Sequence, residues 1–280
     1  MRVSTPTRIG LRILVLLYLA VLLAVPIVTI LWRTFEPGLG AFWASVRTPA
    51  AISAFNLSLL IVAITVPINV IFGVVTAIVL VRGRFPGRRL LSGIVDLPFA
   101  VSPIVVGVSL IMLWGVHGWF GGLEDLGIRV IFGLPGMVIA TVFVTLPFVV
   151  REVEPVLVEI GTEQEQAAAT LGASRWQTFS RITLPAIRWG LTYGVVLTVA
   201  RALGEFGAVI MVSSGFPGVS QTLTLLVHSR YIDDHNTYGA YAAATLLMFL
   251  ALATLLLMTV LDRKRPTAEV AVATTSRSSA

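Results

Sequence analysis

Long apolar runs separated by short polar segments dominate the sequence. An α-helix rises about 1.5 Å per residue, so it needs about 20 residues to cross the roughly 30 Å hydrocarbon core of a bilayer. Six runs are long enough, and they predict transmembrane helices at about residues 13–32, 56–81, 95–115, 132–150, 189–212 and 239–261. The pattern therefore predicts an all-α, polytopic membrane protein with six transmembrane helices, in which 13–262 forms the membrane domain and 1–12 precedes it.

The first apolar run follows several arginines, an arrangement that is also typical of secretory signal peptides. This run is longer than the usual signal-peptide core of about 7–15 residues, and no small-x-small cleavage site ends it. We therefore expect the first run to be retained as a transmembrane helix.

The composition is consistent with lipid as the solvent. Only 12% of the residues are charged and 56% are apolar, whereas soluble domains carry about 25% charged residues. The net charge of +6 comes from bases that flank apolar runs and form no helical stripe, so nucleic acid is not an expected partner. The absence of cysteine excludes disulfides, thiolate metal sites and a cysteine nucleophile.

The distribution of the basic residues predicts the orientation. If both termini are cytoplasmic, 15 of the 20 basic residues lie in cytoplasmic segments, in agreement with the positive-inside rule. The external loops then hold four bases, which are Arg33, Arg47, Arg129 and Arg230. We therefore expect a multi-pass protein of the cytoplasmic (inner) membrane with both termini inside. The segment 263–280 is rich in threonine, serine and alanine and is expected to be a disordered cytoplasmic tail.

The polar segment between the fourth and fifth runs, residues 151–188, carries helix boundaries that a plain linker would lack. Thr162 and Glu165 fit a capping box, in which two side chains satisfy free N–H groups at the start of a helix. Gly172 can end that helix in the left-handed conformation. These signals predict a first short helix in a cytoplasmic loop at 160–185.

A second short helix is expected directly after the glycine. Ser174 and Gln177 again fit a capping box, and Pro185 is expected to stop the helix before the fifth span. Apolar residues then recur at every third position, at Trp176, Phe179 and Ile182. Such a stripe can rest on the bilayer surface or on its own bundle, or it can dock into a groove of a soluble partner.

The chain lacks the residues of common catalytic sites. Its only lysine, Lys264, stands between two arginines, so the sequence contains no Walker A loop for ATP. Neither H-E-x-x-H nor G-x-S-x-G occurs. Two of the three histidines flank a pair of aspartates that could bind a metal, although a solvated loop is the favoured interpretation; the residues are His228, Asp233, Asp234 and His235, with His117 isolated. The sequence predicts neither an enzyme nor a metal site.

Arg201 and Glu205 are the charges that the fifth apolar run contains. They are four residues apart and therefore share one helical face. Charges within the membrane are rare and mark either a pair or a pathway. Two interpretations stay open: a structural salt bridge, or a pair that lines the translocation route, with Arg201 offering a cation to a passing anion.

The polar loop resembles the E-A-A-x3-G-x9-I-x-L-P motif of bacterial ABC importer permeases. In that family the loop forms the coupling helix that sits in a groove of the ATPase subunit. The resemblance implies that the coupling residues are Glu165, Gln166, Ala167, Ala168, Gly172, Ile182, Leu184 and Pro185. One departure is that Gln166 stands where the motif has glutamate; glutamine keeps the hydrogen-bonding capacity but carries no charge for an ion pair.

Longer segments resemble the W-type permease subunits of bacterial sulfate/thiosulfate ABC importers. They are residues 96–103, 146–152, 187–190 and 200–208, and the resemblance covers most of residues 10–262. It implies inward transport of sulfate, with thiosulfate as a second substrate. It also implies four partners: an ATP-binding subunit dimer, a T-type permease, an external sulfate-binding protein and the lipid bilayer. ATP and Mg²⁺ would be bound by the ATPase, and this chain would bind no cofactor.

Two alternatives remain. The R-x-L-G-E-F-G segment is shared with molybdate permeases, so a molybdate or tungstate ABC permease is the first alternative. An anion channel or carrier that works without ATP is the second, and it predicts transport by the chain alone.

Overall fold

The computed structural model describes residues 5–122 and 126–262, so the expected tail at 263–280 lies outside the described residues. Within those ranges the chain is helical and contains no strand, which confirms the all-α prediction. The chain divides into two compact units. The first contains the described residues up to Leu59 together with Ser214–Phe249, and the second contains Leu60–Ser213 and the described residues from Leu250.

The first unit begins with a long, nearly unbroken helical segment whose apolar side chains are exposed, as expected for a helix that faces lipid. A buried hydrogen bond of 2.8 Å between the hydroxyls of Thr34 and Thr245 joins α2 (Val25–Phe35) to α14 (Thr237–Asp262). The elements are α1 (Thr5–Leu19), the π-helical turn η1 (Ala20–Ala24), α2 (Val25–Phe35), α3 (Leu39–Val46), the start of α4 (Pro49–Arg82), α13 (Leu223–His228), the π-helical turn η3 (Ser229–Asp233) and most of α14 (Thr237–Asp262).

Arg230 joins three segments of the first unit. Its guanidinium donates to the carbonyl of Ser45 at 3.2 Å, to the hydroxyl of Thr48 at 2.9 Å and to the carbonyl of Gly239 at 3.0 Å. Burial lowers the pKa of Arg230, and the nearby Asp234 partly offsets that effect. An arginine remains charged under such conditions, so this expected external base holds the unit together.

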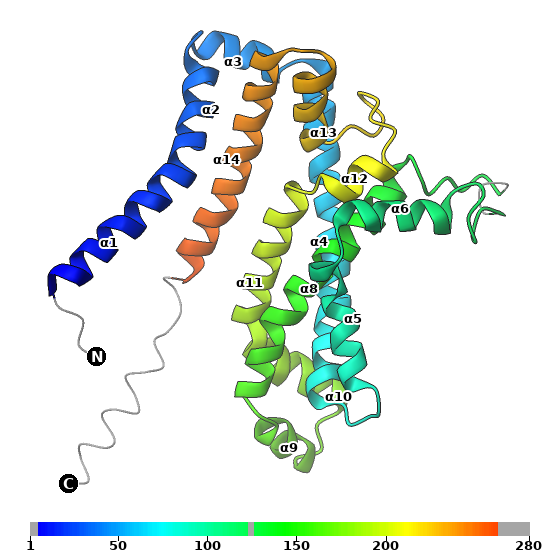
Figure 1. The fold of residues 1–280 in the computed structure, drawn as a ribbon. Coiled ribbons are helices and arrows are strands. Elements are labelled where there is room, and N and C mark those ends of the chain that lie inside the picture. Colours follow the sequence, from blue (N-terminus) through cyan, green and yellow to red (C-terminus); the bar gives the residue numbers. More distant parts are fainter. Residues whose placement is uncertain (1–4, 123–125, 263–280) are drawn as a thin grey trace. The chain divides into compact units, whose positions relative to one another are not determined.

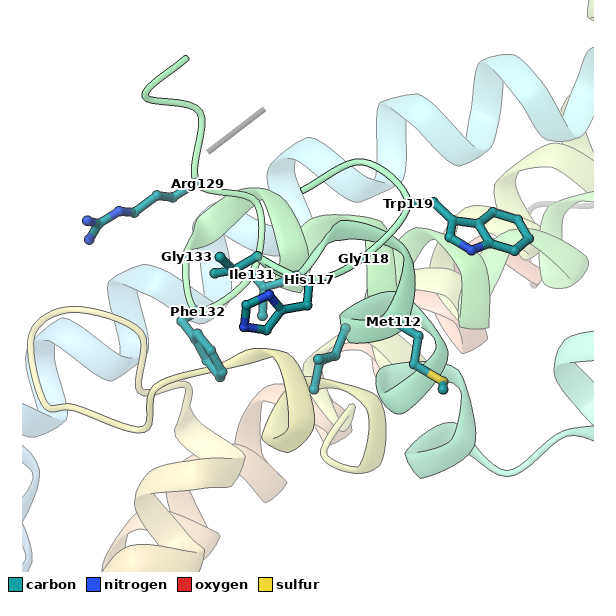
Figure 2. Close-up of a pocket in the computed structure, with 11 residues that line it drawn as sticks. Met112, His117, Gly118, Trp119, Arg129, Ile131, Phe132 and Gly133 are labelled. Carbon is teal, nitrogen blue, oxygen red and sulfur yellow. The ribbon is translucent and has the colours of Figure 1, made fainter. Parts of the chain in front are cut away.

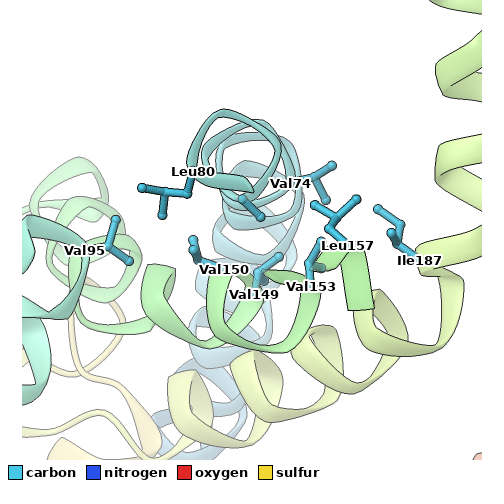
Figure 3. Close-up of a cluster of buried hydrophobic side chains, with 9 residues drawn as sticks. Val74, Leu80, Val95, Val149, Val150, Val153, Leu157 and Ile187 are labelled. Atoms are coloured by element: carbon cyan, nitrogen blue, oxygen red, sulfur yellow. The ribbon is translucent and has the colours of Figure 1, made fainter. Parts of the chain in front are cut away.

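The second unit is built around α8 (Leu134–Glu159), which packs along α11 (Leu184–Leu203) (Figure 1). Its buried side chains form a cluster of valine, leucine, isoleucine and alanine with residues of α4, α5 and α11 (Figure 3). The elements are the rest of α4, α5 (Arg88–Ala100), α6 (Pro103–Trp114), α8 (Leu134–Glu159), α9 (Glu163–Thr170), α10 (Arg175–Thr178), the π-helical turn η2 (Phe179–Thr183), α11 (Leu184–Leu203) and α12 (Gly207–Val212).

Glycines allow α4 and α11 to approach α8 closely at Val149. A Cβ atom added at Gly73 would lie 2.7 Å from the Val149 Cβ, and one added at Gly194 would lie 2.9 Å from the Val149 Cα. One turn away, the amide of Asn69 donates to the Thr145 hydroxyl at 2.6 Å, and both residues are fully buried. Small residues and polar pairs of this kind hold helices together in lipid, where the hydrophobic effect gives little help.

Two of the expected spans are broken rather than straight. The helix expected at 95–115 consists of α5 and α6, whose axes differ by 110° across the break at Val101 and Ser102. The helix expected at 189–212 ends at Leu203, and α12 begins at Gly207. By length and composition, five described helices could cross a membrane, and the bent pair would make a sixth.

The two short helices beyond these breaks pack against each other. A Cβ atom added at Gly107 of α6 would lie 2.6 Å from the Met211 Cβ and 2.8 Å from the Ala208 carbonyl oxygen of α12. Proline at the start of α6 suits a first helical turn, where no N–H partner is needed. The contact between α6 and α12 therefore supports both breaks.

The variant Gly194→Ala tests the close packing on α8. The added methyl group would meet backbone that cannot rotate away, and overpacking of this kind lowers the free energy of unfolding by about 1–3 kcal/mol. The control Gly93→Ala adds the same group on α5, where nothing lies within 4 Å. Denaturant unfolding in detergent micelles compares the two variants, and equal stabilities would contradict the close approach.

Candidate functional site

The loop predicted at 160–185 contains two short helices joined at Gly172, as expected. Gly172 has a φ of +82°, in the left-handed region that favours glycine. Its N–H donates to the Ala169 carbonyl at 3.0 Å, and the Ala173 N–H donates to the Ala168 carbonyl at 3.0 Å. These two bonds form a Schellman motif, which ends α9 and reverses the chain. Figure 1 shows α9 and α10 together at one end of the second unit.

Only one of the two predicted capping boxes is present. Ser174 and Gln177 form the box, because the Gln177 N–H donates to the Ser174 hydroxyl at 3.3 Å and the Ser174 N–H donates to the Gln177 side chain at 2.8 Å. The box predicted at Thr162 is wrong. The Thr162 hydroxyl instead accepts from the Gln166 amide at 2.8 Å, and the Glu165 carboxylate turns toward α4.

The prediction that Pro185 stops the second helix is also wrong. The helix widens into the π-helical turn η2, where the Leu184 N–H donates to the Phe179 carbonyl, and then continues as α11. Pro185 falls in the first turn of α11, a position that tolerates the missing N–H. The second short helix is therefore continuous with a helix long enough to cross the membrane, Arg175–Leu203.

The expected apolar stripe divides into an inner and an outer part. Phe179 packs against the buried cluster on α8, as does Leu184, and Ile182 is partly buried. Trp176 is 72% exposed, although its ring centroid lies 5.6 Å from that of Phe179. The stripe therefore anchors η2 to the bundle and leaves one large aromatic surface outside.

The residues that the resemblance assigns to coupling are divided between the outer surface of the segment and its contact with the bundle. Ala168 is buried and fixes α9 against the rest of the unit. Leu171, beside Gly172, is 88% exposed, and an apolar side chain with that exposure can serve as a contact for another protein. Of the residues that the resemblance assigns to coupling, the exposed ones are Gln166, Ala167, Gly172 and Pro185, and Trp176 is exposed beside them.

Glu165 is the member of the motif region that faces inward. Its Oε2 lies 3.1 Å from the Arg82 Nε, and its Oε1 accepts from the Thr183 hydroxyl at 2.9 Å. Arg82 also donates to the Gly161 carbonyl at 2.5 Å. The sequence offered no local signal for this contact, because Arg82 ends α4 and is distant from Glu165 along the chain.

A second charged cluster, which sequence reasoning also missed, joins α5 to α8. Arg151 donates from Nε to Asp96 Oδ1 at 2.8 Å and from Nη2 to Asp96 Oδ2 at 2.5 Å. The same guanidinium reaches the Ser92 hydroxyl at 2.9 Å and the Glu154 carboxylate. This bidentate pair fixes the end of α8 that leads to α9, since planar forks of this kind specify both distance and orientation.

Arg201 and Glu205 form the expected ion pair, at 2.8 Å between Nη1 and Oε2. They do not share one helix, however, because α11 ends at Leu203 and Glu205 lies in the link to α12. The other oxygen of Glu205 accepts from the Ala208 N–H at 2.8 Å, so this carboxylate joins α11 to α12. The side chain of Glu205 is 1% exposed and that of Arg201 is 34% exposed.

No group of three or more potential ligands that could hold a metal ion occurs among residues 5–122 and 126–262.

His117 lies in a mostly apolar pocket of about 820 Å³ that Met112, Trp119 and Phe132 also line. The Arg129 side chain extends away from the His117 ring (Figure 2). In the His235 region, the ring Nδ1 lies 3.3 Å from the Asp233 carbonyl oxygen.

Comparison with known proteins places this arrangement in a family. Residues 69–265 match the family described as "Binding-protein-dependent transport system inner membrane component". The chain is 46% identical over 252 residues to the "Sulfate transport system permease protein CysW" of Synechocystis sp., which covers 90% of this chain and 91% of that protein. It is 36% identical to the corresponding CysT protein of Escherichia coli (strain K12), over 86% of this chain and 89% of that protein.

The fold has a close counterpart among solved structures. A chain of a bacterial ABC transporter that imports the acidic polysaccharide alginate superposes with a TM-score of 0.74 at 17% identity, covering 92% of this chain and 95% of that chain. At this identity the likeness shows the fold alone, which is the ABC importer permease fold. The family match and the relatives, which are permease proteins, show that the chain is a permease subunit and not an enzyme. It belongs to the inner membrane components of binding-protein-dependent transport systems and, within that family, to the CysW-type permease proteins.

Proposed function

We propose that the chain carries sulfate, with thiosulfate as a second substrate, inward across the cytoplasmic membrane as one subunit of an ATP-driven importer. The similarity to a sulfate permease over nine-tenths of the chain is the observation that carries this proposal. The greater identity to a CysW protein than to a CysT protein favours the W-type position in a heterodimer, with a T-type permease as the second subunit.

The energy has to come from a partner. With no Walker A loop in the sequence, the chain depends on an ATPase dimer that binds ATP and Mg²⁺, while the chain itself binds no cofactor. Gln166, Leu171 and Trp176 are exposed on α9, on the turn after it and on α10, where they can contact the ATPase. Short helices of this kind bind in a groove of a partner protein. An external sulfate-binding protein would supply substrate selectivity. Both chain termini would then be cytoplasmic, as the basic residues predict.

Arg201 is the candidate contact for the anion on its path. Its side chain is partly exposed, whereas Glu205 is buried and held by the Ala208 N–H. A guanidinium presents planar donors that suit oxyanions. The adjacent carboxylate keeps Arg201 in place and lowers its net attraction for an anion, so that sulfate can leave again.

Reconstitution tests the proposed activity. Proteoliposomes that hold the two permeases and the ATPase, with the binding protein outside, should accumulate sulfate only when ATP is enclosed with the ATPase. Uptake of molybdate without sulfate would favour the first alternative. Sulfate flux through this chain alone, with no ATPase present, would show an ATP-independent channel or carrier and would contradict the proposal.

Arg201→Ala should lower ATP-dependent sulfate uptake by about tenfold, because a charge-assisted contact to the anion contributes on the order of 1.4 kcal/mol or more. The assembled complex should remain intact on size-exclusion chromatography. Arg33→Ala is the matched control, since it breaks an exposed pair with Glu36 at 3.4 Å. Dissociation of the complex by Arg201→Ala would favour a purely structural salt bridge.

Gly172→Val should impair uptake more strongly than Gly172→Asn. Space around Gly172 is open, so the cause would be backbone strain of about 1–2 kcal/mol for a side chain at positive φ, which asparagine tolerates better. Gly87→Val imposes comparable strain at a φ of +95°, also in open space, but lies outside the coupling segment. Equal loss of transport in Gly172→Val and Gly87→Val would refute a specific role for this turn.

A further inference from the structure

In this chain the position of the motif glutamate is residue 166, whereas the acidic side chain that faces the bundle belongs to the preceding residue, Glu165. Gln166 occupies the position of the motif glutamate, and it is exposed and bonded locally to Thr162. Glu165, the preceding residue, projects about 100° further round α9, toward Arg82 and Thr183. Gln166 is therefore available to a partner protein, whereas Glu165 contacts other helices of this chain.

Glu165 makes polar contacts with two other elements at once. One oxygen lies 3.1 Å from the Arg82 Nε at the end of α4, and the other accepts from the Thr183 hydroxyl of η2 at 2.9 Å. The side chains of Arg82 and Glu165 are only 18% and 22% exposed, and Thr183 is buried. Partial burial weakens screening by water, so such a pair is stronger than an exposed one.

The apolar attachment of α9 is small by comparison. Its sequence, residues 163–170, contains no large apolar side chain, and Ala168 is its one buried residue within the described structure. Arg82 also donates to the Gly161 carbonyl just before α9. The polar contacts of Arg82 and Glu165 are therefore the principal attachment of α9 to the bundle.

We propose that Glu165, held by Arg82 and Thr183, is the positioning residue through which α9 moves α4 and η2. This inference rests on the proposed function, because it takes α9 to be the element that the ATPase displaces. When α9 is displaced, the contact of Glu165 with Arg82 would move the end of α4. The contact of Glu165 with Thr183 would move the first part of the Arg175–Leu203 helix. Loss of the carboxylate leaves α9 able to move without them.

The attachment is measured first, without reference to transport. Glu165→Gln should raise hydrogen exchange of the amides of residues 163–170 by about tenfold in the purified complex, because a charged hydrogen-bond network is lost. Glu163→Gln removes the same charge at an exposed position of the same helix and should change exchange little. Equal exchange in the two variants would overturn the proposed attachment.

The transmission is measured as sulfate transported per ATP hydrolysed in proteoliposomes. Glu165→Gln should lower this ratio by about tenfold with ATP hydrolysis retained, and Arg82→Lys, which keeps one charged donor, should give an intermediate ratio. A ratio equal to that of Glu163→Gln, together with faster exchange, would overturn transmission through Glu165. Absence of ATP-dependent uptake in the unaltered complex would instead overturn the proposed function, and the exchange result would still decide the attachment.

Discussion

A polar group buried among apolar helices needs a partner, because no water is available to replace one. In the second unit one buried polar pair and one partly exposed ion pair each connect two different helices, and each pair therefore helps to fix which helices meet. Asn69 and Thr145 join α4 to α8 in the buried part of the bundle, and Arg151 and Asp96 join α5 to α8. Glycines then let the helices close on one another around these pairs, and the valine-rich cluster fills the remaining space.

The coupling segment is attached to this frame in two physically different ways. Phe179 inserts η2 into the apolar cluster by packing, whereas α9 is held by Glu165 and Arg82 through charge. Apolar packing keeps η2 from moving closer to the bundle, whereas the Glu165–Arg82 pair also fixes the orientation of α9 relative to the end of α4. The outer surface, with Leu171 and Trp176, remains available to a partner. The segment can therefore face the ATPase on one side and remain joined to the membrane helices on the other.

Hydropathy predicted the approximate places of the helices that are long and apolar enough to cross a membrane, because a lipid solvent requires apolar side chains throughout such a helix. Hydropathy does not register the breaks. At the first break Ser102, which precedes Pro103, has a ψ of 134° and leaves the helical region. The close approach of Gly107 to α12 is a contact between distant segments, which no local pattern predicts. The box at Ser174 was predictable because both of its members are local. The box at Thr162 failed because Arg82, far away in the sequence, competes for the Glu165 carboxylate. The prediction that Pro185 ends the second short helix failed because the π-helical turn η2 lets the helix continue past Pro185 into α11.

If Glu165 transmits the motion of α9, then α9 and the end of α4 move as one body. The sequence contains no cysteine, so spin labels can be placed at Val79→Cys on α4 and Ala169→Cys on α9, both exposed positions of the second unit. Electron–electron double resonance on the complex, with and without trapped ATP, measures the distance between the two labels. We expect the same narrow distance distribution in both states. A shift or a broadening of that distribution when ATP binds would contradict it.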